Sequence, residues 1–93
     1  MSETASVEVL VFGLVQGVFF RVFAQQNAEA LGLTGYVKNI SGGAVEAFAE
    51  GDKIKLEEFI SRLETGPPGS KVERLEINWE GYSSRFNSFG IKY

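Results

Sequence analysis

The hydrophobic residues of this chain change between strand spacing and helix spacing, and the order of these changes limits the possible folds. Residues 7–12 are β-branched or aromatic and predict a strand that is largely buried on both faces. Apolar residues recur at helical spacing over residues 20–31, and Gly32 marks the end of that helix. Residues 35–39 and 44–50 then predict two strands joined by a tight hairpin.

The second half of the chain repeats the change from helix to strand. Asp52 is a candidate N-cap for a helix whose apolar residues follow the i, i+3, i+4, i+7 spacing, and a Gly-Pro-Pro-Gly segment ends that helix. Residues 72–80 alternate regularly, which predicts a strand with Leu75, Ile77 and Trp79 on its core face. Residues 89–93 alternate again and predict a closing strand.

The resulting order is β-α-β-β-α-β followed by one further strand. This order is typical of an α+β, ferredoxin-like (split βαβ) sandwich, in which two helices pack on one face of an antiparallel sheet. With 93 residues the chain is long enough for one core, so we expect a single domain over residues 1–93. Enzymes, RNA-binding modules and regulatory domains all use this fold, so the function has to be argued from a site.

The composition removes the side chains that most often carry out catalysis near neutral pH. The chain has neither cysteine nor histidine. Thiolate nucleophiles, disulfides and Ser-His-Asp triads are therefore excluded, and the commonest zinc ligand is missing. Any chemistry must use Arg, Lys, Asp, Glu, Asn, backbone amides and water.

The charge balance bears on the partners of the chain. Twelve acidic residues outnumber nine basic ones and give a net charge of −3, which disfavours binding to nucleic acid. Residues 1–4 lack a basic segment, and the apolar stretch over residues 7–15 is short and contains Glu8. We therefore expect no signal peptide and no membrane span. The expected protein is a monomer in the cytoplasm.

A glycine-bearing loop over residues 13–21 connects the first predicted strand to the first predicted helix. A loop at this position can direct several backbone N–H groups, together with the helix N-terminus, toward one anion. Gly17 permits the positive φ that such a loop requires, and Arg21 supplies a planar, charged fork suited to phosphate oxygens. The alternative is that the glycines only make a turn and that Arg21 is a solvated surface charge.

Asn39 is the second candidate for a functional role. It ends the second predicted strand, and its side-chain amide can both donate and accept hydrogen bonds, as the positioning of a water molecule requires. The alternative is that Asn39 simply begins the turn at Ser-Gly-Gly.

These two segments together resemble the two signatures of the acylphosphatase family. Residues 13–21 read Gly-x-Val-Gln-Gly-Val-x-Phe-Arg, and residues 35–45 read Gly-Tyr-Val-x-Asn-x-x-x-Gly-x-Val, with Gly51 following. The resemblance spans the whole domain, and both motifs occur in the expected order. Two positions differ: Phe19 is bulky where members often carry a small residue, and Tyr36 stands where Trp is common.

The resemblance implies a metal-independent enzyme without cofactor that hydrolyses acyl phosphates to a carboxylate and inorganic phosphate. By position, Arg21 binds the phosphoryl group and Asn39 orients the attacking water. Inorganic phosphate, as the product, is also expected to inhibit. The loop residues expected to bind the substrate are Gln16, Gly17, Val18, Phe19 and Phe20.

Two other classes of protein remain as alternatives. A regulatory domain could bind a small anion in the same loop without turning it over, and hydrolysis of an aryl acyl phosphate separates it from the enzyme. An RNA-binding module would need aromatic and basic residues on the open sheet face, but the aromatic residue of the third predicted strand, Phe48, has acidic neighbours. Binding of single-stranded RNA at low salt tests that alternative.

Overall fold

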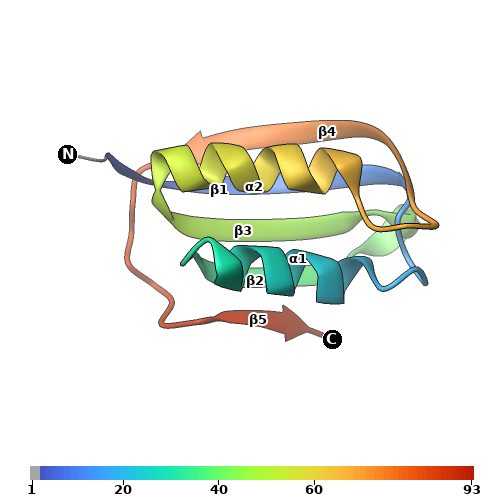
Figure 1. Ribbon diagram of the computed structural model, residues 1–93, viewed down its shortest axis with the longest axis horizontal. Helices are drawn as coiled ribbons and strands as arrows, with labels where there is room; N and C mark the ends of the chain where they lie inside the picture. The colour runs from blue at the N-terminus through green and yellow to red at the C-terminus, as the bar shows by residue number, and fades with distance from the viewer. Residues whose placement is uncertain (1–2) are drawn as a thin grey trace.

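Five strands form one sheet, and two helices cover one of its faces (Figure 1). The computed structural model describes residues 3–93. The elements in chain order are β1 (Thr4–Leu14), α1 (Phe20–Ala30), β2 (Thr34–Asn39), the short 3₁₀ turn η1 (Ser41–Gly43), β3 (Val45–Asp52), α2 (Lys53–Thr65), β4 (Lys71–Glu80) and β5 (Phe89–Lys92).

The strands lie in the order β4-β1-β3-β2-β5, and β1 and β3 pair in the centre. The predicted split βαβ sandwich with both helices on one face is therefore confirmed. One detail differs: β5 pairs with β2 in parallel, whereas the other neighbouring strands are antiparallel. Strand β4 ends at the end of the sheet where β2 begins, and the segment 81–88 crosses to the other edge at that same end (Figure 1). Strand β5 therefore runs parallel to β2 and opposite to β4, the other edge strand.

The core lies between the sheet and the two helices. Alternate residues of β1 point into it, so Val7, Val9 and Val11 are fully buried, whereas Glu8 and Leu10 on the other face are only partly buried. The face of β1 away from the helices is thus less buried than the prediction of a strand largely buried on both faces implies, because only one face of the sheet carries helices. The large side chains of this core include Phe20, Leu56, Phe59 and Leu63.

Strand β4 departs from its predicted burial. Ile77 and Trp79 pair with Val9 and Val7 and so share the helix-covered face, yet they are 42% and 43% exposed. Leu75 packs partly buried against the core as predicted, whereas these two residues are half-exposed, because β4 is an edge strand with no neighbour on its outer side. The ammonium group of Lys53 lies 5.6 Å from the Trp79 ring and covers part of it.

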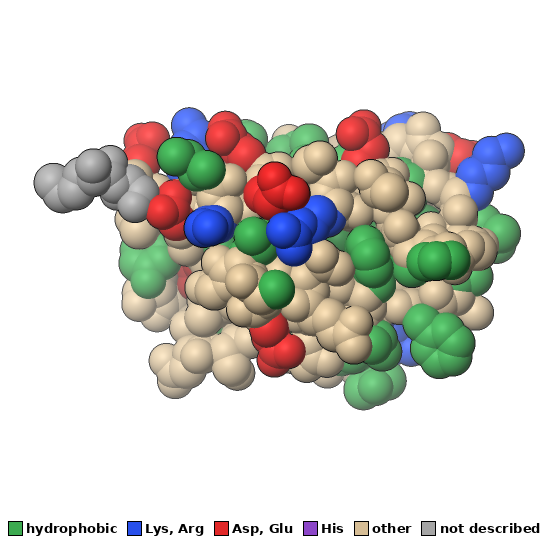
Figure 2. Space-filling model, in the orientation of Figure 1, with side chains coloured by type: hydrophobic (Ala, Val, Ile, Leu, Met, Phe, Trp, Pro, Cys, Tyr) green, Lys and Arg blue, Asp and Glu red, His purple; other side chains and the backbone are tan. Residues whose placement is uncertain are grey.

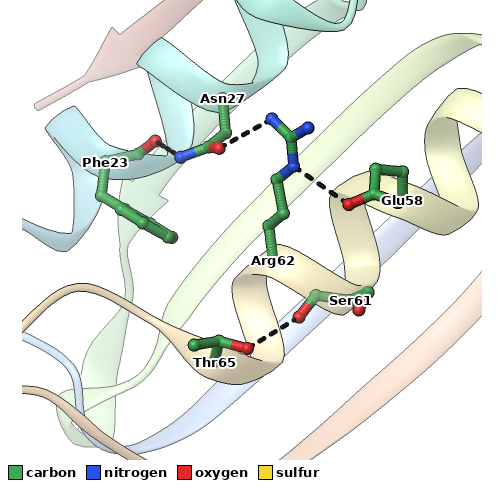
Figure 3. A network of polar contacts seen from close by, with 6 residues as sticks. All are labelled: Phe23, Asn27, Glu58, Ser61, Arg62 and Thr65. Carbon is green, nitrogen blue, oxygen red and sulfur yellow. Dashed lines mark hydrogen bonds and ion pairs between the residues drawn. The ribbon is translucent and has the colours of Figure 1, made fainter.

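Polar contacts fix the start of α2 and its position against α1. Asp52 caps α2 as predicted, because its carboxylate accepts a hydrogen bond from the Ile54 amide at 3.0 Å. Figure 3 shows Arg62 on α2 reaching across to α1, where its guanidinium donates to Asn27 Oδ1 at 3.0 Å. The Asn27 amide in turn donates to the carbonyl of Phe23 at 2.8 Å. These bonds tie α1, which follows the glycine-bearing loop, to its neighbouring helix.

A buried carboxylate holds the segment 81–88 against the sheet. Glu50 is 1% exposed and accepts hydrogen bonds from Ser6 Oγ at 2.7 Å, from the amide and hydroxyl of Ser83, and from the Arg85 amide at 2.9 Å. Burial alone would raise the pKa of this carboxyl, but the hydrogen bonds from Ser83, Ser6 and the backbone outweigh burial and lower the pKa to about 2. The charge at Glu50 is therefore fully satisfied inside the protein.

Candidate active site

The loop between β1 and α1 leaves several backbone N–H groups without partners. Gly17 has a φ of 75°, as predicted, and Phe19 has a φ of 59°, so the chain enters α1 through two left-handed residues. Over the described part of the chain, the N–H groups of residues 16–19 donate to no protein acceptor. Unpaired amides beside a helix N-terminus are suited to an anion, because they offer donors and partial positive charge together.

The side chain of Gln16 connects this loop to the turn after β2. Its amide nitrogen donates to the carbonyl of Ile40 at 3.0 Å and to the carbonyl of Ala44 at 2.8 Å. Both hydrogens of that nitrogen are thus used within the protein, which leaves the backbone N–H of Gln16 as its donor toward a ligand. The contact holds the loop beside Asn39, the last residue of β2.

Arg21 lies in the first turn of α1 and is half-buried. Its guanidinium carbon is 4.7 Å from the centre of the Tyr93 ring. Among residues 3–93, no carboxylate forms an ion pair with Arg21. This cation–π contact uses the charge of the guanidinium and none of its N–H donors, so those donors stay available for an anion.

A pocket of about 310 Å³ joins these groups. Five of the seven predicted site residues line it, whereas Gln16 and Val18 do not. Val18 instead packs, partly buried, against the core. No acidic side chain lines the pocket, so Arg21 is its only charged residue among those described. The lining residues are Val15, Gly17, Phe19, Phe20, Arg21, Val22, Asn39, Ile91 and Tyr93.

Four of the lining residues are not among the predicted site residues: Val15, Val22, Ile91 and Tyr93. The last two come from β5 and the residue after it. Alternation predicts a strand there, but it does not reveal that β5 lies beside β2 and packs against α1. That placement brings Tyr93 over Arg21. The only signal in the sequence is the alternation that continues to the last residue, and it does not specify that the segment pairs with the outer edge of β2.

Residues 3–93 contain neither a metal-binding cluster nor a membrane-spanning helix. No group of three or more His, Cys, Asp or Glu side chains is placed to hold a metal ion. Over the same residues, no helix has both the length and the apolar character needed to cross a membrane.

The fold and the pocket together define a class of protein: a small split βαβ sandwich that offers backbone amides and one arginine to an anion at a strand-to-helix junction. Comparison with known proteins identifies the family within this class. The model of the acylphosphatase family matches residues 7–91, and the chain belongs to the acylphosphatase family. The resemblance seen in the two motifs is thereby confirmed.

Individual relatives agree in sequence and in structure. An acylphosphatase of Dehalococcoides mccartyi is 46% identical over 88 residues, which are 94% of this chain and 97% of the relative. The crystal structure of acylphosphatase from Bacillus subtilis has a TM-score of 0.93 at 36% identity and covers 96% of this chain and 99% of that chain. An acylphosphatase structure from Coxiella burnetii has a TM-score of 0.90 at 35% identity, covering 96% of this chain and 93% of that chain.

Proposed function

We propose that this chain hydrolyses acyl phosphates to a carboxylate and inorganic phosphate, with Arg21 and the loop amides of residues 16–20 holding the phosphoryl group and Asn39 orienting the water. The observation that carries the proposal is the pocket itself. It places an arginine without a carboxylate partner beside a loop with unpaired amides and beside an exposed asparagine. Membership of the acylphosphatase family supports the same reaction.

Arg21 and the loop amides stabilise the charge that spreads over the phosphoryl oxygens during transfer. Phosphoryl transfer depends mainly on positioning and on electrostatic stabilisation, and fixed donors in a pocket supply both. The guanidinium fork donates two parallel hydrogen bonds, which a lysine ammonium cannot match. The Tyr93 ring, 4.7 Å away, restricts the orientation of that fork.

Asn39 orients the nucleophile. Its carboxamide oxygen accepts a hydrogen bond from the water, while the lone pair of the water oxygen is left free for attack on phosphorus. The bond from phosphorus to the acyl oxygen breaks and the carboxylate leaves with that electron pair. Both water protons end on the phosphate, one of them by transfer to a phosphoryl oxygen. Because a carboxylate is a good leaving group, no general acid is needed.

The finer aspects of the proposal concern the assembly and location of the protein. We propose that residues 1–93 act as one domain and as a monomer in the cytoplasm, with a small acyl phosphate as substrate. The net charge of −3 argues against nucleic acid as a partner. Gel filtration with light scattering tests the monomer, and a dimer at micromolar concentration would contradict it.

The direct test is hydrolysis of benzoyl phosphate by the purified chain with a chelator present. Turnover that persists in the chelator supports the proposal. Binding of phosphate without turnover would instead favour a regulatory domain that only binds anions.

Phosphate binding separates the roles of the two main residues. Inorganic phosphate should inhibit competitively and raise the melting temperature, because it binds the native state alone. We expect Arg21→Ala to lose most of this stabilisation and Asn39→Ala to keep it while losing turnover. Asn78→Ala is the matched control, because Asn78 lies on β4 and donates to Glu8, away from the pocket. Equal loss of phosphate stabilisation in the Arg21 and Asn39 variants would show that Asn39 does not act on the water.

A further inference from the structure

Phe19 combines a costly backbone conformation with an exposed side chain. Its φ of 59° and ψ of 27° lie in the left-handed region, which bulky residues rarely adopt. A buried ring could offset that cost through packing, but the Phe19 side chain is 82% exposed. Glycine would fit this backbone at lower cost, so the ring gives the fold no evident benefit. Strain of this kind, where packing does not require it, is typical of a functional position.

Other exposed hydrophobic side chains lie beside Phe19. In the described part of the chain, eight large hydrophobic residues are exposed, and three of them line the pocket: Phe19, Val22 at 39% and Tyr93 at 98%. Figure 2 shows hydrophobic side chains gathered at the lower right, over the β1–α1 loop and the end of β5. Ile91 adds a partly buried apolar surface to the same pocket.

The pocket thus has two chemically different parts. One part is polar and consists of the loop amides, Arg21 and Asn39. The other is an apolar rim, which we define as Phe19, Val22, Ile91 and Tyr93. The volume of the whole pocket, about 310 Å³, is at the lower end of the range for small-molecule sites, which begins at about 300 Å³. A ligand that matches both parts carries an anionic group joined to a compact apolar group.

We propose that Phe19 is a specificity-determining residue: its exposed ring, together with the rest of the apolar rim, contacts the acyl group of the substrate and favours an aromatic acyl group over acetyl. This inference rests on the proposed function, because the phosphoryl group must occupy the polar part for the acyl group to reach the rim. An aromatic acyl group contacts Phe19 and Tyr93 and leaves water on binding, whereas an acetyl group is too small to gain as much. The rim thereby acts on substrate choice, and Phe19 is its main specificity-determining residue.

The experiment compares benzoyl phosphate with acetyl phosphate through the ratio of their kcat/KM values. Contacts with one or two aromatic rings correspond to a wild-type preference for benzoyl phosphate of about five- to tenfold. Phe19→Gly suits the left-handed backbone, so it keeps the fold while removing the ring, and we expect it to reduce the ratio by most of that factor. Tyr93→Ala should reduce the ratio in the same direction, and Phe19→Tyr should restore it.

Tyr82→Ala is the matched control, because Tyr82 is an exposed aromatic residue, 48% exposed, in the segment at the far end of the sheet. Its ratio should equal that of the wild type. A wild-type ratio near one, or a ratio that neither Phe19→Gly nor Tyr93→Ala changes, would overturn the inference.

Binding of phosphonates keeps this test independent of turnover. Phenylphosphonate and methylphosphonate share the anionic group and differ in the apolar one. Calorimetry should show tighter binding of phenylphosphonate to the wild type, and Phe19→Gly should remove most of the difference. If the chain hydrolyses neither acyl phosphate, the proposed reaction fails while this comparison still decides the role of the rim. Equal affinities for the two phosphonates in the wild type would overturn the inference on this readout as well.

Discussion

The two ends of the sheet each hold a charged side chain, and the two charges are treated in opposite ways. At one end, the Glu50 carboxylate is 1% exposed and accepts hydrogen bonds from Ser6, Ser83 and the Arg85 amide. At the other end, the Arg21 guanidinium is half-buried, stacks on the Tyr93 ring and has no carboxylate partner among the described residues. The Glu50 carboxylate thus has its hydrogen-bond partners within the protein, whereas the Arg21 guanidinium has no counter-ion there.

This difference separates a structural charge from a functional one. A buried charge that has all its hydrogen bonds stabilises one conformation and offers nothing to a ligand. A charge that is held in place without a counter-ion can bind an anionic ligand without first breaking an ion pair inside the protein. The hydrogen bonds to Glu50 thus fix the segment 81–88. In the pocket, by contrast, donors stay unpaired where the substrate is proposed to bind.

The largest effect is expected from substitutions of Arg21. We expect Arg21→Ala to lower kcat/KM for benzoyl phosphate by about a thousandfold, because a charge-assisted, two-point contact with the phosphoryl group is lost. Arg21→Lys should lose about a hundredfold, since lysine keeps the charge and not the planar fork. Circular dichroism and thermal melting should show both variants folded. Activity of Arg21→Lys near that of the wild type would mean that the fork is not used.

Substitution of Glu50 should instead lower stability and leave activity unchanged. Glu50→Gln should lower the free energy of unfolding by about 2–3 kcal/mol, because the amide places a donor among groups that already donate. Urea unfolding measures this change, and kcat/KM well below the melting temperature should match the wild type. Glu57→Gln, on the exposed face of α2, is the control and should stay within about 0.5 kcal/mol. A large loss of activity in folded Glu50→Gln would remove the distinction between the two ends.

Acid should remove the contribution of Glu50 to stability over a defined range of pH. The pKa of Glu50 falls from an ordinary 4.5 to about 2 in the folded protein. Its contribution to stability is therefore fully present above about pH 4.5 and is lost as the pH falls toward 2. The loss is of the order of 2–3 kcal/mol. Unfolding curves between pH 6 and pH 2 should show a smaller decrease for Glu50→Gln than for the wild type, and parallel decreases would contradict this role.

The smallest expected effect compares two glycines. Gly17 in the pocket loop and Gly69 after α2 both have positive φ, at 75° and 88°, and neither has an atom within 4 Å of an added Cβ. Alanine at either position should therefore cost about 1 kcal/mol of stability for the backbone conformation alone. We expect only Gly17→Ala to lower kcat/KM, by about tenfold, because it shifts amides that face the phosphoryl group. Equal activities of the two variants would show that the loop geometry is not used.

Much of the fold could be predicted from local patterns. Helical spacing predicts α1 and α2, Asp52 is a predicted N-cap that the structure confirms, and the glycine-bearing loop lies between β1 and α1 as expected. The signatures also placed Arg21 and Asn39, which the structure brings to one pocket although they lie on different elements. These features depend on residues close in sequence or on a motif that already contains the three-dimensional relation.

The features that were missed depend on contacts between distant segments. Alternation placed Ile77 and Trp79 on the correct face, but it could not show that β4 is an edge strand and leaves them half-exposed. Glu50 lies on β3, on the face away from the helices, and its burial depends on contacts with the distant segment 81–88, which no local pattern specifies. Tyr93 reached Arg21 through the parallel pairing of β5 with β2, which no local pattern specifies.

The bridge made by Gln16 also constrains the order in which the protein becomes active during folding. Its amide joins the β1–α1 loop to carbonyls 24 and 28 residues further along the chain. These carbonyls come within reach of Gln16 only after β1 has paired with β3, a contact whose loop-closure entropy must be overcome first. A partly folded chain that has α1 but not the central strand pair would therefore lack an aligned Asn39. Activity should recover together with the global folding transition and never ahead of it, so a refolding experiment read by turnover reports the completed sheet.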